Sequence, residues 1–174
     1  MITGLDLGHA TVTEAEHWLR ETAAGLGPSG DVFACTHLIH GEGARVALSL
    51  SLPLPSLDAL PSLAALSSID EAVAARVAEL HAAGLGGRAV RYPGADALVG
   101  TLTVGELLEL SAIDAVRVIG AASPTPAAET LLETRDFVRP QWEDGRLVLV
   151  AMPAPGGRLM PFEVPNPTPC CAFH

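Results

Sequence analysis

The stretch DVFACTHLIHGEGARVALSLSL, residues 31–52, decides the fold prediction. It holds two runs rich in apolar residues, 31–40 and 45–52, on either side of the short link GEG. Two such runs joined by a tight glycine-containing link are typical of a β-hairpin. Because side chains alternate across a strand, the second run is expected to turn a set of apolar residues toward the core, namely Val46, Leu48, Leu50 and Leu52.

Outside this hairpin, one helix and one short strand are predicted on each side. The strands are expected at 2–7 and 88–92, and the helices at about 14–25 and 69–83, with Gly84 ending the second helix. The resulting order is β-α-β-β-α-β. It matches the split βαβ pattern, so we expect an α+β protein whose N-terminal portion is a ferredoxin-like (βαββαβ) or similar two-layer sandwich.

Three helix starts carry the same pattern, a hydroxyl residue followed three positions later by glutamate. Such a pair can satisfy the free backbone N–H groups of a first helical turn reciprocally. The three pairs are Thr13 with Glu16, Ser68 with Glu71, and Thr103 with Glu106.

From residue 100 onward the sequence predicts a helix followed by an antiparallel β-meander. Asp144-Gly145 between two alternating runs is the strongest hairpin signal in the chain. Further strands are expected at 115–119, 130–138, 146–152 and 158–164. We therefore divide the chain into an α/β sandwich portion, 1–99, and a helix plus meander with a Cys/His tail, 100–174, with one continuous domain as the alternative.

Between the hairpin and the second helix, residues 52–66 repeat leucine at every third position and include three prolines. The prolines oppose a regular helix and the leucines oppose a free linker. We expect an ordered segment that covers apolar surface. An apolar flap that faces a partner is the alternative.

The charge balance excludes several function classes. The 174 residues carry 20 acidic and ten basic side chains, a net charge of −10, and all ten basic residues are arginine. A strongly negative chain repels nucleic acids and anionic lipids, so neither is an expected partner. Without lysine there is no Schiff base and no phosphate-loop lysine. No long apolar run or export signal is visible, so we expect a cytoplasmic protein with reduced cysteines.

The cysteines and histidines suggest one candidate metal site. Cys35 and His37 are two residues apart on a predicted strand, so both side chains emerge on one face. The C-terminal tail adds Cys170, Cys171 and His174. If the tail folds over the hairpin, these groups could hold Zn²⁺, or Cu(I) if thiolates dominate. The alternative is that Cys35 and His37 are a buried pair in the core.

The remaining charged and polar residues give weaker signals. His9, His17 and His81 have no partner in the sequence pattern and are expected at the surface. Arg135 and Arg139 are weak candidates for binding a carboxylate or phosphate, because in this acidic chain most arginines should already be paired. Carboxylate pairs are expected on solvated faces, namely Glu106 with Glu109, and Glu129 with Glu133 and Asp136.

These observations favour a non-catalytic accessory or binding protein for a protein partner or a small ligand, with or without the Cys/His metal site. The alternative is a small enzyme with Cys170 or Cys171 as nucleophile or ligand and His37 or His174 as base. An edge of the meander could pair across a two-fold axis, which leaves a homodimer open.

Overall fold

The computed structural model describes residues 2–24, 32–40, 44–52, 66–121 and 123–165. In these ranges it contains three α-helices, one short 3₁₀-helix and ten strands, and the strands form a single, mostly antiparallel sheet. The expected mixed α+β class is confirmed. No helix in the described ranges has both the length and the apolar composition needed to cross a membrane. The leucine-rich segment predicted to cover apolar surface lies almost entirely outside them.

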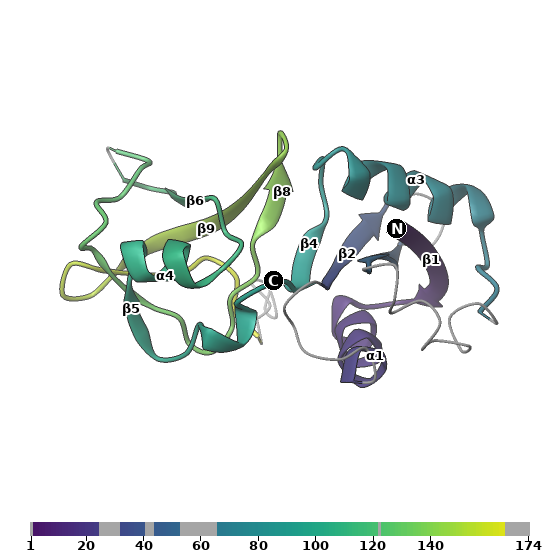
Figure 1. Ribbon diagram of the computed structural model, residues 1–174, viewed down its shortest axis with the longest axis horizontal. Helices are drawn as coiled ribbons and strands as arrows, with labels where there is room; N and C mark the ends of the chain where they lie inside the picture. Colours follow the sequence, from purple (N-terminus) through teal and green to yellow (C-terminus); the bar gives the residue numbers. More distant parts are fainter. Residues whose placement is uncertain (1, 25–31, 41–43, 53–65, 122, 166–174) are drawn as a thin grey trace, which may run out of the picture.

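The N-terminal half contains the predicted hairpin and its flanking helices and strands (Figure 1). The bounds are β1 (Ile2–His9), α1 (Val12–Ala24), β2 (Phe33–Ile39), β3 (Arg45–Ser51), α3 (Glu71–Ala82) and β4 (Arg88–Arg91). The hairpin is confirmed, because β2 and β3 pair antiparallel with Cys35 opposite Ser49. Val46, Leu48, Leu50 and Leu52 are buried in one hydrophobic cluster, as predicted.

The ferredoxin-like arrangement is not confirmed. The element order βαββαβ is present, but the strands run β1-β3-β2-β4, so β4 pairs with β2, whereas a ferredoxin-like sheet would place it beside β1. The two helices also lie on opposite faces of the sheet (Figure 1). Leu48 packs in the cluster that contains Leu19 of α1, whereas the neighbouring Ser49 bonds to His81 of α3.

Strand β3 explains why both faces are covered. Its residues from Val46 to Leu50 are all buried, which requires a layer of side chains on each side of the sheet. On the α3 face the strand presents the small Ala47 and Ser49. These leave room for a helix to approach closely, whereas the larger leucines point at α1.

Only one of the three predicted helix caps is correct. The Thr103–Glu106 capping box is present at the start of α4 (Val104–Leu110). For α1, however, Thr11 and Glu14 form the reciprocal bonds, so the cap lies two residues earlier than predicted. For α3 the cap is Asp70, whose side chain accepts from two backbone N–H groups. The register shift in α1 leaves Glu16 free to point elsewhere.

The C-terminal half wraps around its own hydrophobic cluster. Its elements are η3 (Ala95–Ala97), β5 (Thr101–Thr103), α4, β6 (Ala115–Val118), β7 (Leu131–Glu133), β8 (Gln141–Glu143), β9 (Arg146–Ala154) and β10 (Arg158–Pro161). The hairpin at Asp144-Gly145 is confirmed between β8 and β9, with both turn residues at positive φ. The predicted strand 130–138 is much shorter, because Arg135 and Asp136 adopt left-handed φ values of 55° and 52°.

The prediction that this half is an antiparallel meander is wrong for two of its strand pairs. β6 pairs with β9 in parallel, and so does β10 with β7. A parallel pair needs a crossover rather than a tight turn. Turn residues in the sequence indicate only which neighbouring strands form hairpins, so they could not predict these parallel pairings.

The two halves share a sheet and a core. β4 pairs with β8, which continues the N-terminal strands into the C-terminal ones. Cys35, Ala89 and Tyr92 from the first half are fully buried in the hydrophobic cluster of the second. The division at residue 99 stays a prediction, but any functional surface along this seam must draw on both halves.

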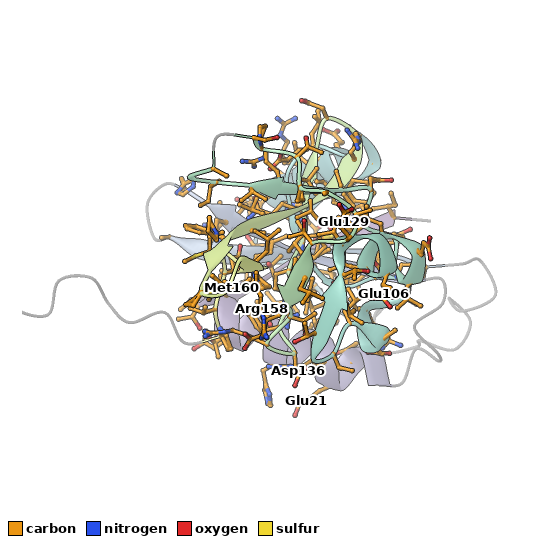
Figure 2. The ribbon with its side chains drawn as sticks, turned by 90° about the vertical axis from the view of Figure 1, so that its left-hand side faces the viewer. Glu21, Glu106, Glu129, Asp136, Arg158 and Met160 are labelled. Atoms are coloured by element: carbon orange, nitrogen blue, oxygen red, sulfur yellow. The ribbon has the colours of Figure 1, made fainter. Side chains whose placement is uncertain are left out.

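The carboxylate pairs do not form an acidic site in the described residues. Glu106, Glu109, Glu129 and Asp136 are exposed and Glu133 is half-buried. Figure 2 shows Glu106, Glu129 and Asp136 spread over this end of the protein rather than gathered. The expected placement on solvated faces is thus supported for the four exposed residues.

Candidate functional site

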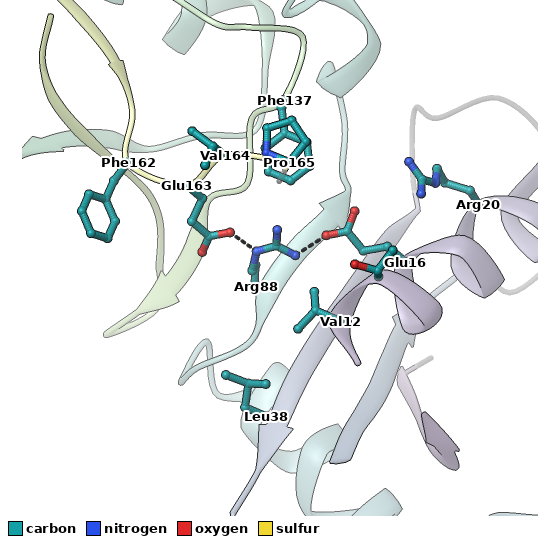
Figure 3. Close-up of a pocket in the computed structure, with 11 residues that line it drawn as sticks. Val12, Glu16, Arg20, Leu38, Arg88, Phe137, Phe162, Glu163, Val164 and Pro165 are labelled. Carbon is teal, nitrogen blue, oxygen red and sulfur yellow. Dashed lines mark hydrogen bonds and ion pairs between the residues drawn. The ribbon is translucent and has the colours of Figure 1, made fainter. Parts of the chain in front are cut away.

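A pocket of about 630 Å³ lies where α1, the β2–β4 strand pair and the segment after β10 meet. Val12, Glu16 and Arg20 reach it from α1, and their spacing of four residues places them on one face of the helix. Leu38 and Arg88 enter from the sheet. The remaining wall comes from the C-terminal half: Phe137, Phe162, Glu163, Val164 and Pro165 (Figure 3).

Arg88 is the central residue of a group of charged side chains in this pocket. Its Nη1 donates to Glu16 and its Nε donates to Glu163, so the guanidinium lies between two carboxylates (Figure 3). Glu163 also accepts a hydrogen bond from Gln141 Nε2 at 3.0 Å. The arginine side chain is 16% exposed and Glu16 only 5%. These ion pairs therefore lie in a largely desolvated setting and join α1, β4 and the segment after β10.

Arg139 completes the network from the loop before β8. Its Nη2 donates to Glu16 Oε2 at 2.9 Å, so Glu16 holds two arginines at once. Its guanidinium also lies 4.2 Å from the centroid of the Phe137 ring, within cation–π range. The prediction that most arginines are paired holds for Arg139. Arg135 is exposed and does not line the pocket.

Glu16 remains ionised in spite of its burial. Burial by itself raises the pKa of Glu16, but the hydrogen bonds and charges of Arg139 and Arg88 outweigh it and hold the pKa below its usual range. A carboxylate that faces two guanidinium groups is the compensation that a buried charge requires.

No protein-family model, curated protein or solved structure matches this chain. The case for a function therefore rests on the chemistry of the described side chains.

A smaller pocket of about 340 Å³ adjoins the large one. The two share four lining residues, Val12, Leu38, Arg88 and Glu163. The smaller pocket reaches around the end of the sheet to His37. Gly87 makes space for this imidazole, because a Cβ at that position would lie 2.6 Å from His37 Cε1.

Behind His37 lies a buried chain of polar side chains between the sheet and α3. His37 Nε2 and His81 Nδ1 each lie 2.8 Å from the Ser49 hydroxyl oxygen. A hydroxyl can donate to one imidazole and accept from the other, so two neutral histidines satisfy this arrangement. Burial and the neighbouring His81 lower the pKa of His37 to about 4, and burial also lowers the pKa of His81. Ser49 is completely buried, which withholds its hydroxyl from a substrate.

These two histidines should make the protein sensitive to mild acid. Well above pH 6.5 both imidazoles are neutral in the folded and the unfolded chain. As the pH falls from 6.5 toward 4, the unfolded chain takes up protons at His37 more readily than the folded chain, so the free energy of unfolding should fall by roughly 2–3 kcal/mol for this residue. Urea unfolding at a series of pH values measures this loss.

Matched variants identify the source of that pH dependence. His37→Gln should make the profile between pH 6.5 and 4 less steep, leaving the contribution of His81, whereas His17→Gln should leave it unchanged, because His17 lies on the exposed surface beside Glu21. An unaltered slope in the His37 variant would contradict the assignment.

The predicted Cys/His residues are only partly within the described ranges. Cys35 and His37 lie on the same face of β2, as predicted, and both are buried. Burial raises the pKa of the Cys35 thiol to about 12, so it stays protonated at neutral pH. Cys170, Cys171 and His174 lie outside the described ranges. Within those ranges no group of three or more His, Cys, Asp or Glu could hold a metal ion, and the five-residue Zn or Cu site stays a prediction.

Sequence reasoning missed most of the observed site. His81 was expected at the surface, but it is 6% exposed. The spacing of Ala74, Val77 and His81 along α3 could have shown that it shares the buried stripe. Glu16 was assigned to a helix cap. For Arg88 and Glu163 the sequence offered no signal, because their partners are distant in the chain.

Proposed function

We propose that this protein is a non-catalytic binding protein whose large pocket holds a small ligand with an apolar body. One observation carries the proposal: a cavity of about 630 Å³ in which apolar side chains surround an ion-paired arginine. Small-molecule sites commonly have volumes of about 300–1,000 Å³, with mostly apolar walls and a few polar groups that orient the ligand.

Exposed apolar side chains at the pocket support this proposal. Leu38 and Phe162 line the pocket and are 64% and 53% exposed. A ligand seated between them would remove this apolar surface from water, which is favourable. Phe137 and Val164 extend the same wall.

Binding is favoured over catalysis by the state of the titratable groups. Glu16, Arg88 and Glu163 are engaged in ion pairs, which leaves none of them as a free base or nucleophile. The Ser49 hydroxyl, which lies between two imidazoles, is completely buried and lines neither pocket. A general base or a nucleophile needs access to the reacting atoms.

A fluorescence titration with N-phenyl-1-naphthylamine, a neutral apolar probe, tests the pocket. We expect saturable binding with one site per chain. Thr13→Trp places a bulky ring in the pocket from an exposed position on α1 and should weaken binding at least about tenfold. The matched control is Thr125→Trp, at an exposed threonine outside the pocket.

The melting temperature of both variants confirms that each is folded. Binding that does not saturate, or that weakens equally in the two variants, would overturn the proposal.

A further inference from the structure

The pocket concentrates positive charge in a negative protein. Arg20 and Arg88 line it, and Arg139 lies directly behind Glu16. Among the described residues that line the pocket, the acidic ones are Glu16 and Glu163, so three guanidinium groups are present with two carboxylates, although the whole chain has a net charge of −10. A local excess of positive charge attracts an anion more strongly than a cation.

The two carboxylates on Arg88 are not equivalent. Glu16 is 5% exposed and is held by Arg139 as well as Arg88. Glu163 is 28% exposed and lies after the end of β10, outside the strand pairing that would fix its backbone. Moving the Glu163 carboxylate into water therefore costs less than moving that of Glu16.

The two side chains that donate hydrogen bonds to Glu163 form a site that could bind another carboxylate, and we call this site the seat. The Glu163 oxygens accept from Arg88 Nε and from Gln141 Nε2, two donors supplied by neighbouring strands. Guanidinium and amide N–H groups arranged around one carboxylate would accept another carboxylate in the same way. Phe162 and Val164, the apolar neighbours of Glu163 in the chain, line the same pocket (Figure 3).

We propose that the ligand is an apolar monocarboxylate whose head replaces the Glu163 carboxylate on Arg88 and Gln141. This inference rests on the proposed function and adds the chemical class of the ligand. The exchange keeps Arg88 paired throughout, so binding leaves no buried cation without a partner. Glu163 acts as an internal competitor that fills the seat when the ligand is absent. Arg20, exposed on α1 at the same pocket, adds attraction for the incoming anion.

Decanoate and decan-1-ol provide a matched pair of probes, because they share the apolar chain and differ in charge. Each is titrated, below the concentration at which decanoate forms micelles, against bound N-phenyl-1-naphthylamine. We expect decanoate to bind the wild-type protein more tightly than decan-1-ol. In Glu163→Gln, which removes the competing charge, decanoate should bind roughly tenfold more tightly still, and decan-1-ol should not change.

Glu143→Gln is the charge-matched control. Glu143 pairs with Arg117 and does not line the pocket, so its replacement changes the net charge equally. It should leave the affinity for decanoate unchanged. A gain of similar size in both variants would show a general charge effect and overturn the assignment of the seat.

The outcomes separate the two proposals. Equal affinities for decanoate and decan-1-ol in the wild type and in Glu163→Gln would reject the carboxylate head and leave the apolar pocket standing. Tighter binding of decylammonium than of decanoate would reject it as well. If the naphthylamine probe fails to bind, binding of decanoate to Glu163→Gln is measured directly by calorimetry. The absence of any heat of binding would then reject both proposals.

Discussion

Replacing Glu16 by glutamine should lower the free energy of unfolding by about 3 kcal/mol at neutral pH, because it removes the buried charge that holds two arginines. Arg88 would keep Glu163, but Arg139 would lose its only charged partner in the described residues. Urea unfolding followed by circular dichroism measures the change. The amide keeps the size of the side chain, so the loss reports charge rather than a cavity.

The effect of this substitution should depend on pH with a definite sign. The pKa of Glu16 is lowered in the folded protein, so its contribution is fully present above the ordinary glutamate pKa and is lost as the pH falls through the folded value. The difference between wild type and Glu16→Gln should therefore shrink in acid. Glu21→Gln, at an exposed residue of the same helix, should have little effect. A pH-independent loss would argue against a charge-based role.

Replacing Gly4 by alanine should destabilise the protein by about 3 kcal/mol or more. A Cβ on this residue of β1 would lie 1.8 Å from the carbonyl oxygen of Ala74 and 3.0 Å from Val77 Cγ2, both on α3. The oxygen belongs to the helix backbone, so a rotamer change cannot relieve the clash and α3 must move away from the sheet. The expected loss in the free energy of unfolding is therefore at the upper end of the range for overpacked cores. Thermal unfolding and urea unfolding both report it.

Gly105→Ala is the matched control in α4. A Cβ there meets Ala128 at 3.4 Å, an approach that a small shift accommodates. Alanine also favours a helix over glycine by about 0.5–1 kcal/mol. This variant should be neutral or more stable than the wild type. If both alanine variants had the same stability, the close packing of β1 against α3 would be contradicted.

The movement of α3 in Gly4→Ala would also test the buried polar chain. His81 lies on α3 and reaches Ser49 on the sheet at 2.8 Å. A helix displaced from β1 would lengthen this hydrogen bond and admit water. The acid sensitivity described for His37 should then be weaker in the alanine variant than in the wild type.

Several elements of the fold could be predicted because their causes are local. The β2–β3 hairpin, the Asp144-Gly145 turn and the Thr103–Glu106 cap each depend on residues within a few positions of one another. The shared face of Cys35 and His37 follows from the two-residue period of a strand. Where two local patterns competed, as with Thr11–Glu14 and Thr13–Glu16, the sequence alone did not select the right one.

The sequence by itself determined the mixed α+β class of the fold, the order of its N-terminal elements and the net charge of −10. Only the tertiary structure decided that α1 and α3 cover opposite faces, and that Glu16 meets Arg88 and Arg139, 72 and 123 residues away in the chain. The physical reason is the range of the interactions. Turns, caps and alternation depend on neighbours along the chain, whereas the partner of a buried charge depends on which strands the topology brings together.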